Sequence, residues 1–167
     1  ANYRSHRKIA VIDGQIGYMG GMNLDREQLP GNNRLGAWRD THLRIVGEAV
    51  LALQASFAVS WFNATKERLG DPIYFPREQP DDLPFTPIQI TPGGPDSQWK
   101  AMGQLYFFMI MNANSKVQIQ SPFFIPDESL LEAIKAAALS GVQVEIMCSL
   151  HGTNLELPHR AAFTYFA

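Results

Sequence analysis

The chain has 167 residues, and its 14 Lys and Arg against 16 Asp and Glu give a formal net charge of -2. This balance lacks the basic excess that a dedicated nucleic-acid-binding protein usually carries, so charge alone names no partner. Hydrophobic residues make up 46% of the sequence and charged residues 18%, which excludes intrinsic disorder and provides for a packed core.

The sequence also argues against a membrane-spanning helix or a disulfide framework. Its longest apolar run, Leu105 to Met111, is far shorter than the roughly 20 residues that cross a bilayer. The single Cys148 excludes an internal disulfide and a cysteine-based metal site, and it suits a reducing compartment. Because the sequence opens at Ala1 directly before an informative motif, we interpret it as part of a longer protein.

The first predicted element is a β-hairpin within the segment from His6 to Met22. Apolar and β-branched residues flank Asp13-Gly14, a dipeptide that favours the left-handed backbone of a tight turn. In the resulting register, open space lies beside the imidazole of His6, because its partner Gly21 has no side chain. The register pairs Ile12 with Gln15, Ala10 with Gly17, Lys8 with Met19 and His6 with Gly21.

A strand and a long helix come next. We predict a strand from Arg39 to Ile45 and a helix from Glu48 to Lys66, in which polar residues recur mostly at steps of three and four. The remaining faces of the helix are apolar, so we expect them to be largely buried. The polar stripe consists of Glu48, Ser56, Ser60, Asn63 and Glu67.

A proline-rich segment then separates two parts of the chain. Seven prolines lie between Gly70 and Pro95, a density that is typical of a linker. Beyond this linker we expect a buried apolar helix capped by Ser97, and then a strand, a helix closed by Gly141 and a second strand. That βαβ order implies a parallel strand pair. The predicted ranges are Ser97 to Asn112, Lys116 to Gln120, Asp127 to Ser140 and Val142 to Cys148.

The residues that suggest chemistry lie on the predicted hairpin. Side chains alternate along a strand, so His6 and Lys8 share one face, and Asn23 has the same parity as Gly21 on the partner strand. Gly20-Gly21 allows a bulge that would shift this alignment. A neutral imidazole can attack phosphorus, while an ammonium and an amide stabilise charge on the non-bridging oxygens. The pattern therefore indicates phosphoryl transfer, with the ammonium in place of a metal ion.

These residues resemble the HKD motif of the phospholipase D superfamily. The matching pattern is His6-x-Lys8, then Asp13, Gly20-Gly21 and Asn23. Within the superfamily the flanking residues most resemble those of bacterial cardiolipin synthases. Further resemblance lies in residues 38–45, WRDTHLRI, and in residues 121–130, SPFFIPDESL.

The resemblance implies an α/β fold of phospholipase D type, with sheets flanked by helices and a site between two pseudo-symmetric lobes. Residues 1–69 would end the first lobe, residues 70–96 would be the linker, and residues 97–167 would begin the second lobe. No second His-x-Lys with suitable downstream residues follows His6. We therefore expect the second motif to lie beyond Ala167.

The resemblance also implies an activity and a role for each motif residue. The activity is transfer of a phosphatidyl group, making cardiolipin from phosphatidylglycerol through a phosphohistidine on His6, with a second histidine protonating the leaving alcohol. Neither a metal nor a cofactor is implied. Lys8 and Asn23 would bind the phosphate, with Gly21 beside them, and Asp40 would fix the tautomer of His6. Asp13 completes the motif, and we expect it mainly to hold the turn through hydrogen bonds to nearby backbone amides.

The implied partners are a phospholipid and, through the parent protein, the cytoplasmic face of a bacterial cell membrane, with no nucleic acid. Two other functions stay open: a phosphodiesterase or nuclease of the same superfamily, and a noncatalytic lipid-binding scaffold if the natural chain has no second motif. A homodimer that pairs two copies of His6 is a further possibility.

Several other residues are assigned ordinary structural roles. Arg39 and Arg44 are expected to be solvent-exposed, and His42, His151 and His159 are given no role in the site. Phe123 and Phe124 would either contact acyl chains or pack in the core.

Overall fold

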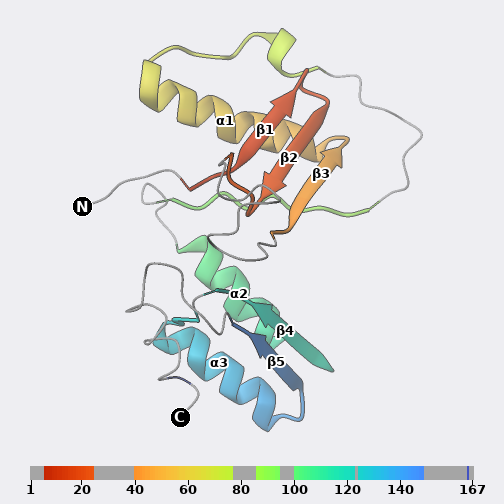
Figure 1. Ribbon diagram of the computed structural model, residues 1–167, viewed down its shortest axis with the longest axis vertical. Coiled ribbons are helices and arrows are strands. Elements are labelled where there is room, and N and C mark those ends of the chain that lie inside the picture. The colour runs from red at the N-terminus through yellow and green to blue at the C-terminus, as the bar shows by residue number, and fades with distance from the viewer. Residues whose placement is uncertain are drawn as a thin grey trace, which may run out of the picture. The chain divides into compact units, whose positions relative to one another are not determined.

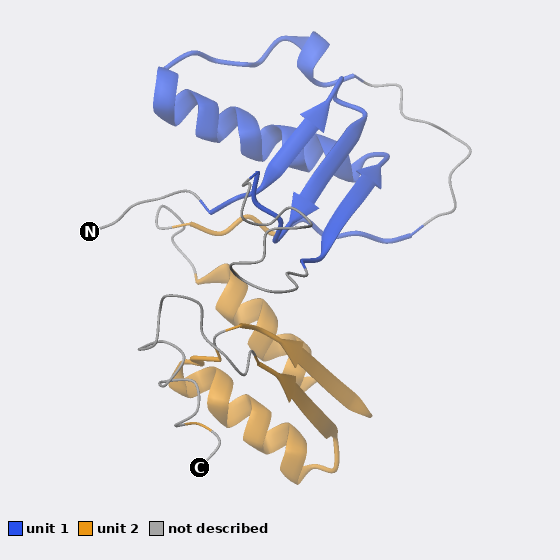
Figure 2. Cartoon of the chain, in the orientation of Figure 1, with its two compact units in different colours: residues 1–90 blue, residues 91–167 orange. Residues whose placement is uncertain are grey.

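The computed structural model describes residues 6–24, 40–76, 86–94, 100–122, 124–148 and 165. The chain divides into two compact units, Ala1–Ile90 and Thr91–Ala167 (Figure 2). The architecture is mixed α/β, with a small sheet in each unit (Figure 1). The elements are β1 (Ile9–Ile12), β2 (Ile16–Gly20), β3 (His42–Val46), α1 (Ala49–Thr65), η2 (Pro72–Tyr74), α2 (Ala101–Met111), β4 (Lys116–Gln120), α3 (Glu128–Leu139) and β5 (Gln143–Met147).

The first unit is a three-stranded antiparallel sheet in the order β1-β2-β3, with α1 packed on one face. Alternation along β1 directs Ile9 and Val11 toward the core beneath α1, while Ala10 and Ile12 lie on the outer face. The core centres on Ile45, Val50 and Leu53, each at most 4% exposed. Helix α1 therefore covers one face of this sheet, and Ala10 and Ile12 are exposed on the other.

The hairpin forms where the sequence predicts it, but the predicted register is wrong by one residue. Asp13 and Gly14 have φ of 54° and 66°, and the Gln15 N–H donates to the Ile12 carbonyl at 3.0 Å, as a tight turn requires. Gln15 is then an extra residue, so Ile12 pairs with Ile16. The other observed pairs are Val11 with Gly17, Ala10 with Tyr18 and Ile9 with Met19.

Core packing explains this shift. It moves Gly17 to the core side of the sheet, where a Cβ on Gly17 would lie only 2.6 Å from Leu53 Cδ1. The predicted register would have put Gly17 opposite Ala10, on the outer face. The turn itself is also packed, because a Cβ on Gly14 would lie 2.9 Å from Pro76 Cγ and 3.1 Å from the Tyr74 carbonyl oxygen.

The predicted strand and helix that follow are both present, with shifted ends. The strand begins at His42 rather than Arg39, which lies outside the described residues. Helix α1 agrees with the predicted range, with Glu48 as its N-cap and Lys66 ending it at φ 65°.

The expected burial of the apolar faces of α1 is wrong. Phe57, Val59 and Trp61 are 39%, 53% and 38% exposed. A helix of 17 residues is about 25 Å long, whereas strands of 4 or 5 residues reach about 17 Å. The second half of α1 therefore extends past the sheet that the described residues form.

The second unit contains the predicted parallel pair. β4 has the predicted bounds, β5 lies within the predicted range, and the two strands are joined through α3. At the start of α3, the Asp127 carboxylate accepts the Leu130 N–H at 2.9 Å and the Ser129 hydroxyl at 2.7 Å. The hydrogen bond from Leu130 and, to a smaller extent, that from Ser129 hold the pKa of Asp127 below its ordinary value of 3.8. Gly141 follows the helix at φ 92°, as the sequence predicts.

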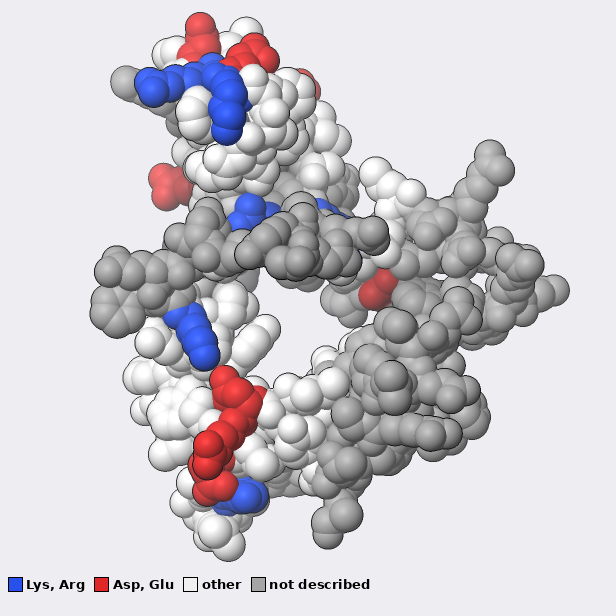
Figure 3. Space-filling view, turned by 90° about the vertical axis from the view of Figure 1, so that its left-hand side faces the viewer, with Lys and Arg blue, Asp and Glu red and all other residues white. Residues whose placement is uncertain are grey.

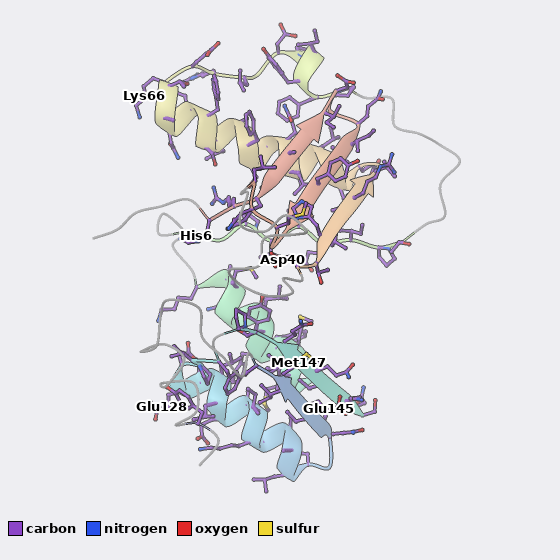
Figure 4. The ribbon with its side chains drawn as sticks, in the orientation of Figure 1. His6, Asp40, Lys66, Glu128, Glu145 and Met147 are labelled. Atoms are coloured by element: carbon purple, nitrogen blue, oxygen red, sulfur yellow. The ribbon has the colours of Figure 1, made fainter. Side chains whose placement is uncertain are left out.

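The outer face of the β4-β5 sheet is polar. The Glu145 carboxylate, labelled in Figure 4, binds Lys116 Nζ at 2.9 Å and accepts hydrogen bonds from Gln118 Nε2 at 2.7 Å and Gln143 Nε2 at 2.9 Å. Lys116 is the main cause that lowers the pKa of Glu145. The opposite face of this sheet packs on the core of the second unit.

Helix α2 is shorter and more exposed than the sequence predicts. It begins at Ala101, and the proposed cap Ser97 lies outside the described residues. Ile110 is its buried residue, while Phe108 and Met109 are 64% and 58% exposed, so the expected buried helix is wrong. The reason is that α2 packs against α3, and no described element covers its other faces. Phe124, at 5% exposure, packs in the core with Ile110, Ala133, Ile134, Ala137 and Val142.

Charges of both signs are mixed on the described surface. On the face drawn in Figure 3, Lys and Arg side chains lie among Asp and Glu side chains, and the described residues form no large basic patch there. None of the helices within the described ranges has both the length and the apolar character needed to span a bilayer.

Candidate active site at one end of the first sheet

Antiparallel pairing brings most of the predicted site residues to one end of the first sheet. β1 begins, β2 ends and β3 begins at this end, because neighbouring strands run in opposite directions. His6 and Lys8 precede β1, Gly21 and Asn23 follow β2, and Asp40 precedes β3. Figure 4 shows His6 and Asp40 at this end of the first unit.

Arg7 lies between His6 and Lys8 in the sequence, and its side chain points toward helix α1. The side chains of His6 and Lys8 lie on the other side. Arg7 Nη1 donates to the Ser60 hydroxyl of α1 at 3.0 Å, which directs Arg7 toward the helix. His6 is exposed and Lys8 is partly exposed. Lys8 Nζ donates to the backbone carbonyl of His6 at 2.8 Å. The ammonium is thereby held close to the residue that carries the imidazole.

The glycine pair at the end of β2 lets the start of β3 approach closely. The Gly21 N–H donates to the Thr41 carbonyl at 3.0 Å. A Cβ on Gly21 would lie 2.5 Å from Asp40 Oδ1 and 3.2 Å from Asp40 Cγ. The observed register, extended by two residues beyond β1, sets Gly21 opposite Arg7, so the predicted pairing of His6 with Gly21 is wrong. The Asp40 carboxylate lies against Gly21.

Asp13 lies at the opposite end of the hairpin from His6. It is exposed, and its left-handed backbone forms the turn. The hydrogen bonds expected from its carboxylate to backbone amides do not occur among the described residues. Its contribution to this part of the chain is the conformation of the turn.

His42 also lies at this end of the sheet, although the sequence was interpreted as giving it no role. It pairs with Gly20 across β2 and β3. A Cβ on Gly20 would lie 2.8 Å from His42 Nδ1, so the imidazole lies over this glycine. The one available signal was parity, because Asp40 and His42 are two apart in a predicted strand and so belong to one face.

A separate apolar cavity of about 600 Å³ lies in the second unit. Tyr106, Met109 and Ile110 of α2 line it together with Ile119 of β4 and Phe124. Its lining is mostly apolar, so it suits an apolar group rather than phosphate chemistry.

Comparison with known proteins identifies the relatives of this chain. A family model described as "Cardiolipin synthase, PLD-like domain" matches residues 106–166. The chain is 48% identical over 148 residues to "Cardiolipin synthase" of Listeria monocytogenes serotype 4a (strain HCC23), covering 87% of this chain and 30% of that protein. "Cardiolipin synthase" of Geobacillus kaustophilus (strain HTA426) is 46% identical over 146 residues, covering 87% of this chain and 29% of that protein.

The chain is homologous to bacterial cardiolipin synthases, and its residues 106–166 match the model of a phospholipase D-like domain. The resemblance predicted from the motif is thus confirmed. The chain spans about 30% of the length of these relatives.

The end of the first sheet carries an imidazole, an ammonium and an amide, which are groups that can take part in phosphoryl transfer. An imidazole such as that of the exposed His6 can act as a nucleophile, the Lys8 ammonium can supply a positive charge, and the Asn23 amide can donate a hydrogen bond. The described residues contain no group of His, Cys, Asp and Glu suited to holding a metal ion. Lys8 supplies a positive charge at this end of the sheet, whereas Arg7 is directed toward α1.

Proposed function

We propose that the protein acts as a phosphatidyltransferase that makes cardiolipin from phosphatidylglycerol, with His6 as the nucleophile. The observation that carries this proposal is the exposed His6 with the Lys8 ammonium beside it, at the sheet end where Asp40 packs on Gly21. The homology to cardiolipin synthases over 87% of the chain supports the same activity.

The reaction has two steps. A nitrogen of the His6 imidazole attacks the phosphorus of phosphatidylglycerol, the P–N bond forms, and the bond to the glycerol headgroup breaks. Glycerol leaves with a proton from a general acid. A hydroxyl of a second phosphatidylglycerol then attacks phosphorus, the P–N bond breaks, and the proton returns to the general base. The second histidine that the family resemblance implies would serve as this acid and base.

Each motif residue has a role in these steps. Lys8 and Asn23 stabilise the charge on the non-bridging oxygens, which is greatest in the transition state. Asp40 holds the far nitrogen of His6 in one tautomer. Gly21 has no side chain, which lets the Asp40 carboxylate approach. Asp13 forms the turn of the hairpin. The reaction uses no metal and no cofactor.

We also propose how the lobes of the whole protein are arranged and where in the cell it works. Residues 1–69 and 97–167 belong to two pseudo-symmetric lobes joined by the linker 70–96, and the second lobe supplies the second histidine. The enzyme works at the cytoplasmic face of the membrane, where its phospholipid substrates lie.

A nuclease is the alternative within the same superfamily. Backbone binding to nucleic acid needs clustered cations. The mixed charges in Figure 3 do not favour it. A noncatalytic lipid-binding scaffold is the other alternative, and the experiment below separates it from an enzyme.

The test uses the full-length protein and phosphatidylglycerol labelled in its phosphate. We expect an acid-labile phosphoenzyme that His6→Ala abolishes, since the P–N bond needs the imidazole. Lys135→Gln, on the exposed side of α3, is the control and should leave labelling unchanged. Labelling that survives His6→Ala would exclude His6 as the nucleophile. A wild-type protein that never becomes labelled or makes cardiolipin would point to the scaffold.

A further inference from the structure

The outer face of the first sheet aligns His42 with the proposed phosphate site. His42 pairs with Gly20 across β2 and β3, and Ile9 pairs with Met19 across β1 and β2. Extending this pairing by one residue sets Lys8 beside Gly20. His42, Gly20 and Lys8 therefore lie in one row across the sheet, on the face turned away from α1.

Within this row the His42 imidazole lies against Gly20 of the middle strand. A Cβ on Gly20 would lie 2.7 Å from His42 Cα and 2.8 Å from His42 Nδ1. Because β2 lies between β3 and β1, His42 and Lys8, which directly precedes β1, flank Gly20 from its two sides.

The two nitrogens of this ring have different surroundings. Nδ1 is buried and has no hydrogen-bond partner, whereas Nε2 is not among the buried unpartnered atoms of the described residues. Nδ1 faces the methylene of Gly20, which offers no acceptor for an N–H. A buried N–H without an acceptor is costly, so the neutral ring carries its proton on Nε2.

We infer that His42 is a second phosphate-binding residue, whose Nε2–H donates to a non-bridging oxygen of the substrate held by Lys8. This inference rests on the proposed function. His42 acts as a neutral donor and does not compete with His6 as nucleophile, because its unprotonated nitrogen is closed off against Gly20. The ligand class is a phosphate mono- or diester, of which inorganic phosphate is the simplest analogue.

Two substitutions separate binding by Nε2 from a structural role of the ring. The amide of His42→Gln places an N–H near the position of Nε2, whereas the amide of His42→Asn reaches only the position of Nδ1. In the full-length protein we expect His42→Asn to raise the inhibition constant of inorganic phosphate by about tenfold or more, since a hydrogen bond to a charged group is lost. His42→Gln should restore most of this affinity, to within about threefold of wild type.

A structural role predicts a different result. If both variants weaken phosphate inhibition equally, or if neither does, His42 is not a phosphate donor. If His42→Asn does not fold, an NMR titration of the unsubstituted protein tests the same inference. With 15N-labelled histidine, added inorganic phosphate should shift the Nε2–H resonance of His42, assigned by its absence in His42→Gln. An unshifted resonance at saturating phosphate overturns the inference.

The experiments distinguish failure of the role inferred for His42 from failure of the proposed function. Suppose that His6→Ala abolishes the phosphoenzyme while inorganic phosphate inhibits His42→Asn as strongly as it inhibits wild type. The role inferred for His42 is then wrong, and the transferase proposal stands. If labelling survives His6→Ala, the transferase mechanism fails, whatever the affinity of His42→Asn for phosphate.

Discussion

At the scale of single residues, the glycines at the end of β2 explain how the site is assembled. Gly20 and Gly21 stand against Thr41, His42 and Asp40, which begin the neighbouring strand. Their neighbours differ, because Gly20 faces backbone atoms and Gly21 faces the end of a side chain. A flexible side-chain end can move aside, whereas backbone in a hydrogen-bonded sheet cannot. The two positions should therefore respond differently to the same substitution.

We predict that Gly21→Ala impairs transfer more than it impairs folding. The added methyl group displaces the Asp40 carboxylate, which lies 2.5 Å from the position of the new Cβ. The expected loss in kcat is about tenfold or more, with a loss of about 1 kcal/mol or less in the free energy of unfolding. Urea unfolding and transferase assays on the same preparations measure both quantities.

Gly20→Ala provides the matched comparison. Its methyl group meets the Thr41 carbonyl oxygen and His42 Cα, so about 1–3 kcal/mol of unfolding free energy should be lost. If Gly21→Ala retains full kcat, or if it destabilises the protein as much as Gly20→Ala, this account of the glycine pair is wrong.

At the scale of elements, helix α3 is specified locally at both ends. Asp127 caps its N-terminus, and Gly141 follows its C-terminus in the left-handed conformation. These signals are short-range, so the sequence alone was sufficient to predict the helix.

We predict that Asp127→Ala destabilises the second unit in a pH-dependent way. The pKa of Asp127 is lowered in the folded protein, so its carboxylate stabilises the fold above the unfolded pKa near 3.8. The stabilisation decreases as the pH falls through the folded pKa. The difference in unfolding free energy between wild type and Asp127→Ala should thus be largest at neutral pH and vanish in acid. Urea unfolding followed from pH 7 downward measures it, and Asp127→Asn is the control that keeps a capping side chain.

The hairpin shows where prediction from sequence reaches its limit. The turn at Asp13-Gly14 follows from local backbone preferences and is present. The register depends on Gln15 being extra and on Gly17 lying under Leu53, which is a tertiary contact between elements. The place of His42 over Gly20 depends on the same cross-strand pairing. Sequence reasoning therefore could not predict the register or the place of His42, because both depend on pairing between strands.

Burial was the other property that the sequence did not determine. The apolar character of α1 and α2 was interpreted as burial, yet Trp61 and Phe108 are 38% and 64% exposed. Apolar residues predict that a surface is suited to packing, but exposure depends on which elements lie against it.

At the scale of the whole molecule, the two units have separate cores. One contains Ile45, Val50 and Leu53, and the other contains six buried residues, including Ile110 and Phe124. No residue belongs to both clusters. Stability within each unit should therefore depend mainly on its own core.

We predict that Leu53→Ala destabilises the first unit selectively. Leu53 is 1% exposed and contacts the Gly17 region of β2, so its truncation should cost about 2–5 kcal/mol. Amide hydrogen exchange should accelerate in β1, β2 and α1, while protection in α3 and β5 is retained. Ile134→Ala in α3 is the reciprocal control, since Ile134 is 7% exposed in the other core. Equal acceleration in both units after either substitution would contradict this independence.

The contact of Gly14 with Pro76 and Tyr74 has a mechanical consequence for catalysis. The turn of the hairpin packs against the segment after α1, while the opposite end of the hairpin leads to His6 and Lys8, which precede β1. Because the two strands connect these ends, a change in the packing of the turn would shift the residues at the other end, where small displacements strongly affect a reaction rate. Under the proposed function, substitutions at Pro76 would therefore lower turnover although His6 and Lys8 are unchanged.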